Sequence, residues 1–233
     1  MTSITRRNFL TLATTALAGT AVAGCSIVGG ADAAEEAAPK KMAPPQDESR
    51  ILVAYFSVPE ADDPDGMTED EENSTHVVDG NVLGNTQYVA QIISRRTGAE
   101  VFRIETAEQL PLDHDTLEDL ALEQQEAGAR PKLKSPIRNL EDYDTVFVGY
   151  PIWWYELPMP MHTFFEGHDF SGKNVIPFST HGGNGLSGTV ETITETVSDS
   201  AVVGNAFTIS RDDMGDAEAE VGDWLERIGM ARK

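Results

Sequence analysis

The chain has 233 residues, which is enough for one α/β domain with a sizeable core and additional segments. It carries 39 acidic and 17 basic side chains, for a formal net charge of -22. This excess of acid excludes nucleic acid as a partner, because such a surface cannot neutralise a phosphate backbone, and it is typical of a well-solvated protein.

Residues 1–24 have the pattern of an export signal. Arg6 and Arg7 precede an apolar stretch, FLTLATTALAGTAVAG, that is too short and too rich in small residues for a membrane span. Paired arginines before such a stretch are typical of the twin-arginine route. The stretch ends in VAGC at 22–25, which resembles the lipobox of bacterial lipoproteins. We therefore expect a lipid anchor at Cys25 on the outer face of the bacterial cytoplasmic membrane; the alternative is a buried structural cysteine in an ordinary helix.

Residues 25–49 are rich in Ala, Pro, Gly and charged side chains, and they show no apolar period. This composition predicts a flexible tether between the anchor and a domain at 50–233. The chain has one cysteine, so it can form no internal disulfide.

Residues 50–233 alternate between short apolar runs and amphipathic runs. The predicted strands are Ile51–Phe56, Val101–Ile104, Thr145–Gly149, Val175–Ser179 and Ala201–Ser210, the last of which Gly204-Asn205 can break. The predicted helices are Asn85–Arg96, Thr116–Glu126, Leu157–Phe165, Leu186–Val197 and Asp213–Ile228. This alternation predicts a doubly wound, five-stranded parallel α/β sheet with helices on both faces. The ligand crevice of such a sheet lies outside the carboxyl ends of its strands.

Residues 58–83 fit neither pattern and form an acidic insertion after the first strand. The segment contains many carboxylates and no lysine or arginine. Its end, HVVDGNV, predicts a small hairpin that turns at Asp79-Gly80. The acids lack the regular spacing and the glycine of a calcium loop, so a solvated insertion is favoured over a metal site.

The first chemically useful segment is split by this insertion. Ser57 closes the first strand, and GNT at 84–86 opens the next helix. Backbone N–H groups at a helix N-terminus, with the Ser57 and Thr86 hydroxyls, can hold a phosphate dianion without any lysine or arginine. Gly84 lets the backbone come close to the anion.

Two further segments follow the third and fourth strands. Trp153 and Trp154 offer flat faces for a planar heteroaromatic ring beside stiffening prolines, and the glycines of THGG at 180–183 let the backbone approach a ring edge. Each motif alone has an ordinary alternative: a plain helix start, paired core or interface tryptophans, or a turn that His181 caps. Their order after successive strands favours one shared site.

The motifs YFS…GNT, GYPxWW and PFxTHGG resemble the bacterial exported branch of the flavodoxin-like family. They occur here at 55–57 with 84–86, at 149–154 and at 177–183, and DFSGK at 169–173 also matches. The resemblance covers residues 50 to about 229. Tyr155 stands where many relatives have glycine.

The resemblance implies non-covalent FMN, with its phosphate in a loop that 58–83 interrupts and its isoalloxazine between the two later loops. The residues implied to bind the cofactor are Ser57, Gly84, Asn85, Thr86, Pro151, Ile152, Trp153, Trp154, Thr180, His181, Gly182 and Gly183.

The expected function is that of a redox protein. FMN would carry the chemistry without any catalytic side chain, since most of the five histidines are expected at the surface or in caps. The electrons would pass to a redox partner protein, or to a small quinone-like acceptor if the protein is an FMN-dependent oxidoreductase. The rival class is a non-catalytic exported lipoprotein that uses the same fold to bind a ligand or partner.

Overall fold

The computed structural model describes residues 50–197 and 199–232. The predicted signal at 1–24, the tether at 25–49 and the anchor residue Cys25 lie outside the described residues. Within the described part of the chain, no helix is both long enough and apolar enough to cross a membrane.

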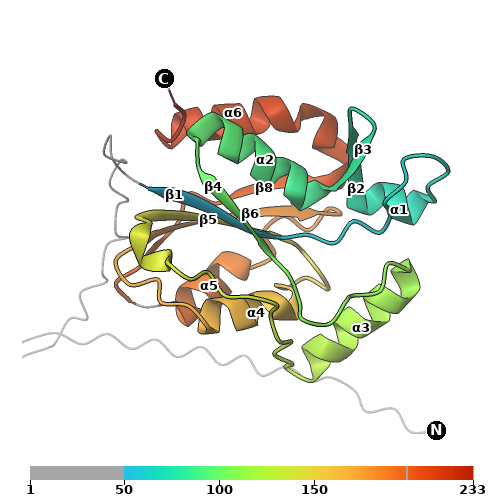
Figure 1. Cartoon of the computed structure of the whole chain (residues 1–233), viewed down its shortest axis with the longest axis horizontal. Coiled ribbons are helices and arrows are strands. Elements are labelled where there is room, and N and C mark those ends of the chain that lie inside the picture. The colour runs from blue at the N-terminus through green and yellow to red at the C-terminus, as the bar shows by residue number, and fades with distance from the viewer. Residues whose placement is uncertain (1–49, 198, 233) are drawn as a thin grey trace, which may run out of the picture. The chain divides into compact units, whose positions relative to one another are not determined.

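The central sheet is parallel throughout (Figure 1). Its strands are β1 (Ile51–Phe56), β4 (Glu100–Ile104), β5 (Thr145–Pro151), β6 (Asn174–His181), β7 (Val202–Val203) and β8 (Phe207–Ser210). The order is β4-β1-β5-β6, and both β7 and β8 pair with β6. The expected fifth strand is split into β7 and β8 around Gly204-Asn205, where Asn205 has a φ of 53°. The predicted α/β class and doubly wound arrangement are confirmed.

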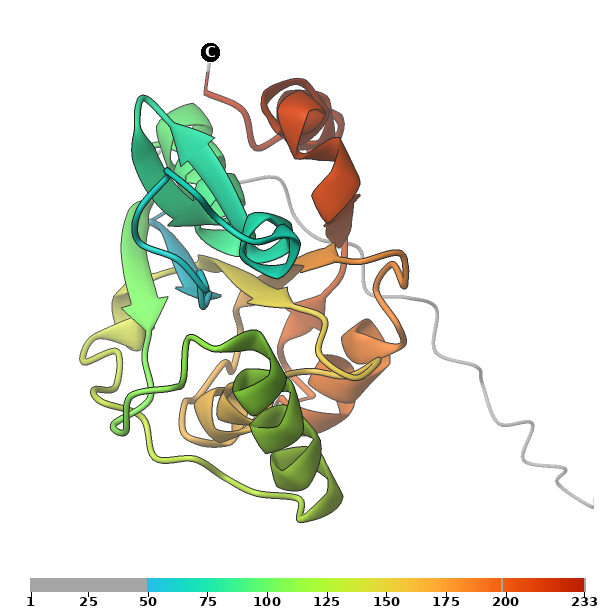
Figure 2. The same ribbon diagram turned by 90° about the vertical axis from the view of Figure 1, so that its right-hand side faces the viewer.

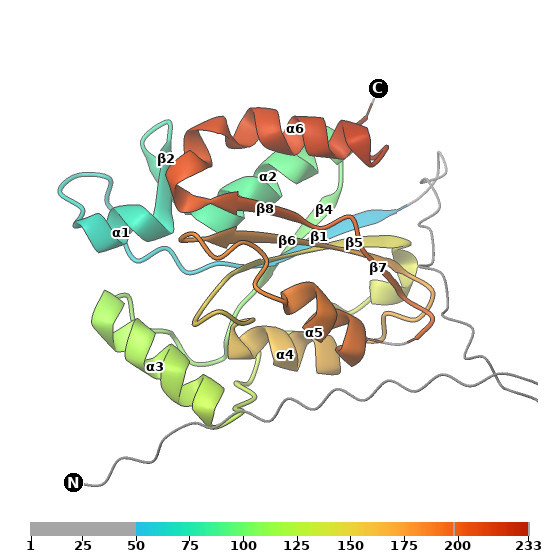
Figure 3. The same cartoon turned by 180° about the vertical axis from the view of Figure 1, so that it is seen from behind.

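Helices cover both faces of the sheet (Figures 1 and 3). One face carries α2 (Asn85–Thr97) and α6 (Ala217–Arg227), and the other carries α4 (Met159–Glu166) and α5 (Thr189–Thr196), with α3 (His114–Glu126) on the same side as α4. Two short 3₁₀ helices are present at Leu140–Asp142 (η1) and Arg211–Asp216 (η2). The second occupies the start of the predicted last helix, so α6 begins four residues later than expected.

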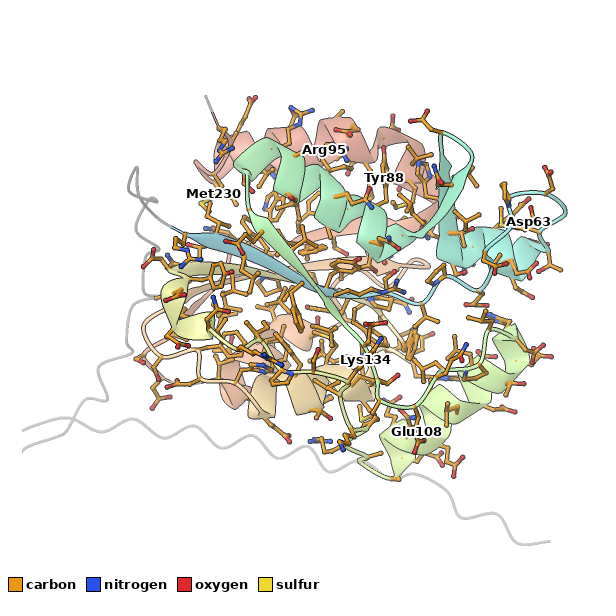
Figure 4. The ribbon with its side chains drawn as sticks, viewed as in Figure 1. Asp63, Tyr88, Arg95, Glu108, Lys134 and Met230 are labelled. Atoms are coloured by element: carbon orange, nitrogen blue, oxygen red, sulfur yellow. The ribbon has the colours of Figure 1, made fainter. Side chains whose placement is uncertain are left out.

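Two apolar cores lie on opposite faces of the sheet because successive strand residues point to opposite sides. Val53 of β1 packs in the core under α2 and α6, whereas Leu52 packs in the core under α4 and α5. Burial on both faces explains why the strands are continuous apolar runs rather than alternating ones. Side chains fill the space on both sides of the sheet (Figure 4).

The insertion has secondary structure of its own. The hairpin of β2 (Thr75–Val78) and β3 (Asn81–Gly84) turns at Asp79 and Gly80, whose φ values are 49° and 78°, as a tight two-residue hairpin requires. This hairpin was predicted. The preceding helix α1 (Glu69–Ser74) was not, although its capping box of Thr68 and Glu71 is a recognisable sequence signal.

The hairpin delivers the chain directly into α2, because β3 ends at Gly84 and α2 begins at Asn85. The His76 ring stacks on the Tyr88 ring with centroids 4.3 Å apart, which holds the hairpin against α2. Figure 2 shows the hairpin lying beside this helix. The two halves of the split loop are thereby brought together at the carboxyl end of β1.

Candidate functional site

A cavity of about 380 Å³ opens at the carboxyl ends of β1, β5 and β6. Most of the sequence-predicted residues line it: Ser57, Asn85, Thr86, Pro151, Ile152, Trp153, Trp154, Thr180, His181 and Gly182. Gly84 and Gly183 adjoin these residues without lining the cavity. Ser57, Asn85, Thr86 and Thr180 are buried and form what we call the inner wall.

Gly84 shapes the inner wall through its lack of a side chain. A Cβ at this position would lie 2.1 Å from Ser57 Oγ and 3.3 Å from Ser57 Cβ. Any other residue would therefore displace the serine hydroxyl. Arg103 Nη2 also donates a hydrogen bond of 3.2 Å to the Ser57 carbonyl and fixes the backbone there.

The N-terminus of α2 faces the same space and has no side-chain cap. Its first turn contains no acidic residue, so no carboxylate of that turn offsets the partial positive charge of the helix end. Asn85 Nδ2 donates to the Asn73 carbonyl at 2.9 Å, whereas Asn85 Oδ1 is buried without a hydrogen-bond partner among the described residues. The inner wall thus holds both unused donors and one unused acceptor.

Thr86 and Thr180 join α2 to β6 through their hydroxyls. The two oxygens are 2.7 Å apart and buried. One hydroxyl donates in this bond, so the proton of the other is left for a further partner. The Thr86 hydroxyl, expected to contact a phosphate together with Ser57 and the helix amides, is also one half of this pair.

The tryptophans lie in a strained turn after β5. Trp153 and Glu156 exchange backbone hydrogen bonds of 3.1 and 2.9 Å around Trp154 and Tyr155, whose φ values of 47° and 64° are in the left-handed region. Phe56 meets the Trp153 ring edge-on at 5.4 Å, and Trp154 Nε1 donates to the Glu118 carbonyl at 3.1 Å. Both indoles are therefore fixed by contacts outside the turn.

The loop after β6 is capped by its own histidine. The Gly183 N–H donates to His181 Nδ1 at 2.8 Å, and Gly183 has a φ of 117°. Burial holds the pKa of His181 below its ordinary value, despite the nearby Asp213 and Asp212. His181 is thus a neutral ring whose second nitrogen, Nε2, carries the proton.

A second side of the cavity comes from residues that the motifs did not indicate. We call Glu60, Asp70, His114, Leu117 and Glu118 the outer wall; the first two belong to the insertion and the others to α3. His114 Nδ1 is 2.8 Å from Glu60 Oε2, so the pair joins the insertion to α3. The Glu60 backbone N–H donates to Ser74 Oγ at 3.0 Å. The insertion is therefore part of the site and not only a solvated loop.

Both members of this pair have shifted pKa values. Burial raises the pKa of the Glu60 carboxyl, although the hydrogen bond and charge of His114 oppose the shift. Burial lowers the pKa of His114, but the hydrogen bond and charge of Glu60, together with the charges of Asp70 and Glu118, outweigh that effect and raise it overall. The outer wall thus favours a protonated imidazole.

The other histidines lie away from the cavity. His76 stacks on α2, and His168 accepts the Ile137 N–H at 3.0 Å, which is a structural contact. His162 Nε2 is buried in α4 without a partner among the described residues. In the described part of the chain, no group of three or more His, Cys, Asp or Glu is placed to hold a metal ion.

Sequence reasoning missed several other lining residues: Val58, Asn73, Ser74, Ala121, Tyr155, Asn184 and Arg211. Most come from the insertion or α3, whose approach to the strand ends no local pattern indicates. Arg211 is different, because it directly follows the last strand and so belongs to the same edge of the sheet as the predicted loops.

In comparison with protein families, the family model described as flavodoxin matches residues 77–228, more than half of the chain. Comparison with curated proteins gave no match.

Solved structures share the fold. A Bacteroides eggerthii protein, described as a candidate flavoprotein, is 27% identical, with coverage of 77% of this chain and 98% of its own and a TM-score of 0.56. A similar Bacteroides uniformis protein is 24% identical, with coverage of 76% and 98% and a TM-score of 0.55. A Lactobacillus acidophilus flavoprotein in complex with FMN is 18% identical, with coverage of 73% and 99% and a TM-score of 0.49.

Proposed function

The chain belongs to the flavodoxin family, and from this premise we propose that its cavity binds FMN non-covalently and that the protein is an FMN-dependent redox protein. The observation that carries the proposal is the inner wall, which has unused hydrogen-bonding groups of the kinds a phosphate and a polyol require. When bound, FMN supplies the electron transfer, which no side chain of the cavity can perform.

The inner wall fits a phosphate group. The uncapped amides of α2, the Ser57 hydroxyl and the free proton of the Thr86–Thr180 pair are all donors. Gly84 keeps the space beside Ser57 open, because a Cβ would fill it. Fixed amide dipoles make such a site attractive to an anion even in a strongly acidic chain.

The buried acceptor Asn85 Oδ1 fits the ribityl chain. An unpaired buried amide oxygen costs about 1–3 kcal/mol, so this position favours a ligand group that donates a hydrogen bond. Ribityl hydroxyls are such donors, whereas a phosphate dianion is not. The inner wall therefore matches both the phosphate and the polyol to which it is attached.

The tryptophan turn and the loop after β6 fit the planar ring. Trp153 and Trp154 provide apolar faces that exclude water, and Pro151 and Ile152 complete this side. On the other side, the 180–183 loop brings backbone close to the cavity. These residues orient the ring and tune its affinity for electrons.

The electrons pass to a redox partner protein or to a small quinone-like acceptor. Trp154 and Tyr155 are 38% and 66% exposed, so the ring side of the cavity is accessible from outside. A reductive titration followed by acceptor assays separates the two roles. Reversible flavin reduction with slow direct turnover indicates a carrier, and rapid nicotinamide-dependent quinone reduction indicates an oxidoreductase.

We also propose export by the twin-arginine route with lipidation of Cys25. That route carries folded proteins, which suits a protein that acquires FMN in the cytoplasm. The acidic domain would be repelled by an anionic membrane surface, and residues 25–49 would serve as the tether. Cys25→Ser should lose membrane retention in fractionation. Unchanged retention without an attached lipid in mass spectrometry would refute this part of the proposal.

The phosphate assignment is tested with a double variant, Ser57→Ala with Thr86→Ala, titrated with FMN and with riboflavin, which lacks the phosphate. Charge-assisted hydrogen bonds contribute about 1.5–3 kcal/mol each, so FMN should weaken far more than riboflavin. Ser171→Ala is the control, because Ser171 precedes β6 and lies at the opposite end of the sheet. Equal loss for both ligands would refute the assignment.

A further inference from the structure

Arg211 is the single lysine or arginine among the described residues that line the cavity. Its position follows from strand register: β6 and β8 pair in parallel with His181 opposite Ser210, so the next residues, Gly182 and Arg211, are neighbours. A Cβ on Gly182 would lie 3.2 Å from Arg211 Cζ. Because glycine has none, the guanidinium packs directly against the backbone of the loop after β6.

The guanidinium of Arg211 has no anionic partner among the described residues. The ion pairs of that part of the chain use Arg50, Arg95, Arg96, His114, Arg130 and Lys134. Asp212 and Asp213 follow Arg211 in sequence, and neither pairs with it. In a chain with 39 acidic residues, a cation that stays unpaired and lines a ligand cavity is available for an anionic ligand.

We propose that Arg211 is an anion-recognition residue, whose guanidinium binds a negatively charged group of the flavin in this cavity. The inference rests on the proposed function and adds a full positive charge to a cavity whose inner-wall donors are neutral. Two groups of FMN have the required chemistry: the phosphate and the reduced ring, which becomes anionic. The planar N–H fork of arginine suits either one.

The phosphate is tested by titrating Arg211→Gln with FMN and riboflavin. Loss of the guanidinium should weaken FMN on the order of tenfold and leave riboflavin unchanged, since tenfold corresponds to about 1.4 kcal/mol. Arg227→Gln is the matched control, because Arg227 is an exposed arginine in the last turn of α6 and does not line the cavity. Arg211→Lys, which keeps the charge without the fork, should retain part of the affinity.

The ring is tested by measuring the midpoint potential of the bound flavin. If Arg211 stabilises the reduced ring, Arg211→Gln should make the potential more negative than in Arg227→Gln, with the ratio of FMN to riboflavin affinity unchanged. A variant with the same affinity ratio and the same potential as Arg227→Gln, and with an unchanged circular dichroism spectrum, would overturn the proposal.

A wild-type chain that binds no flavin would refute the proposed function rather than the role of Arg211. In that case the full chain is titrated with inorganic phosphate and followed by NMR. Shifts at the Gly182 amide that Arg211→Gln loses and Arg227→Gln keeps would support anion recognition. No shifts in the wild-type chain would overturn it.

Discussion

The inner and outer walls of the cavity are built in different ways. The inner wall lies at the ends of β1 and β6 and on the first turn of α2, and all four of its residues are buried. The outer wall joins the insertion to α3 largely through one side-chain pair, Glu60 with His114, and the His114 side chain is 39% exposed. The inner wall therefore suits the part of a ligand that is always bound in the same way. The outer wall, which fewer contacts hold, suits ligand entry, ligand release or the choice of partner.

The largest expected effect on stability tests the rigidity of the inner wall. Thr86→Val removes one hydroxyl of the buried pair and leaves Thr180 without its partner, which should cost about 1–3 kcal/mol of unfolding free energy. The double variant with Thr180→Val should recover part of the loss, because no hydroxyl then stays unpaired. Denaturant unfolding of all four proteins measures the coupling. Additive losses would show that the pair does not act as a unit.

Trp153→Ala tests the tryptophan turn on the ring side of the cavity. The variant loses the edge-on contact with Phe56 and the apolar face for the ring, so FMN affinity should fall by up to about tenfold. Entry of water should also favour the charged reduced ring and raise the potential. His181→Ala should affect affinity less, since His181 caps its own loop. A larger effect at His181 would contradict this order.

The outer wall should depend on pH. The pKa of His114 is raised in the folded state, so the stabilisation by the pair is fully present below the ordinary value of 6.5 and is lost as pH rises through the folded pKa. Burial and the charges of Asp70 and Glu71 also raise the pKa of Glu60. A raised pKa of this carboxyl likewise means that the folded state loses stability as pH rises. Because His114 is partly exposed, the effect should stay below about 1 kcal/mol.

The measurement for this pH prediction is the difference in unfolding free energy between the wild-type chain and His114→Gln from pH 5 to pH 8. The difference should be largest at pH 5 and shrink as pH rises. A difference that grows with pH would show that His114 is buried as the neutral ring.

The smallest expected effect concerns the turn at Tyr155. The left-handed φ of 64° costs a non-glycine residue roughly 1–2 kcal/mol, which glycine would relieve. Glycine also increases the conformational entropy of the unfolded chain, and this cancels part of the stabilisation. Tyr155→Gly should therefore stabilise the protein by a few tenths of a kcal/mol. Tyr155→Ala keeps a Cβ and is the matched control, so it should show no gain. Equal melting temperatures for the two variants would argue against strain in the turn.

The difference between the walls also explains how much the sequence predicts. The strands at Ile51–Phe56 and Thr145–Pro151 are buried on both faces, so apolar runs identify them. Ser57 and Gly84 are 27 positions apart, yet their proximity was predicted because both belong to one recognisable loop. Motifs at strand ends predict a site because the sheet brings those ends together.

The outer wall could not be predicted in this way. No periodicity indicates that Glu60 meets His114, since the contact depends on how the insertion and α3 pack after the sheet has formed. The helix α1 has a capping box that was available in the sequence, but its short length hides it in an acidic run. The position of Arg211 beside Gly182 depends on the register of β8 against β6, and only the structure provides that register.

The central claim is that this cavity binds FMN, and a visible absorption spectrum tests it most directly. The full chain, purified without added flavin and then reconstituted with FMN, should show the absorption bands of oxidised flavin. Heating or acid should release FMN, because the attachment is non-covalent. A colourless protein that acquires no flavin on reconstitution would contradict the account and favour a ligand-binding lipoprotein without redox activity.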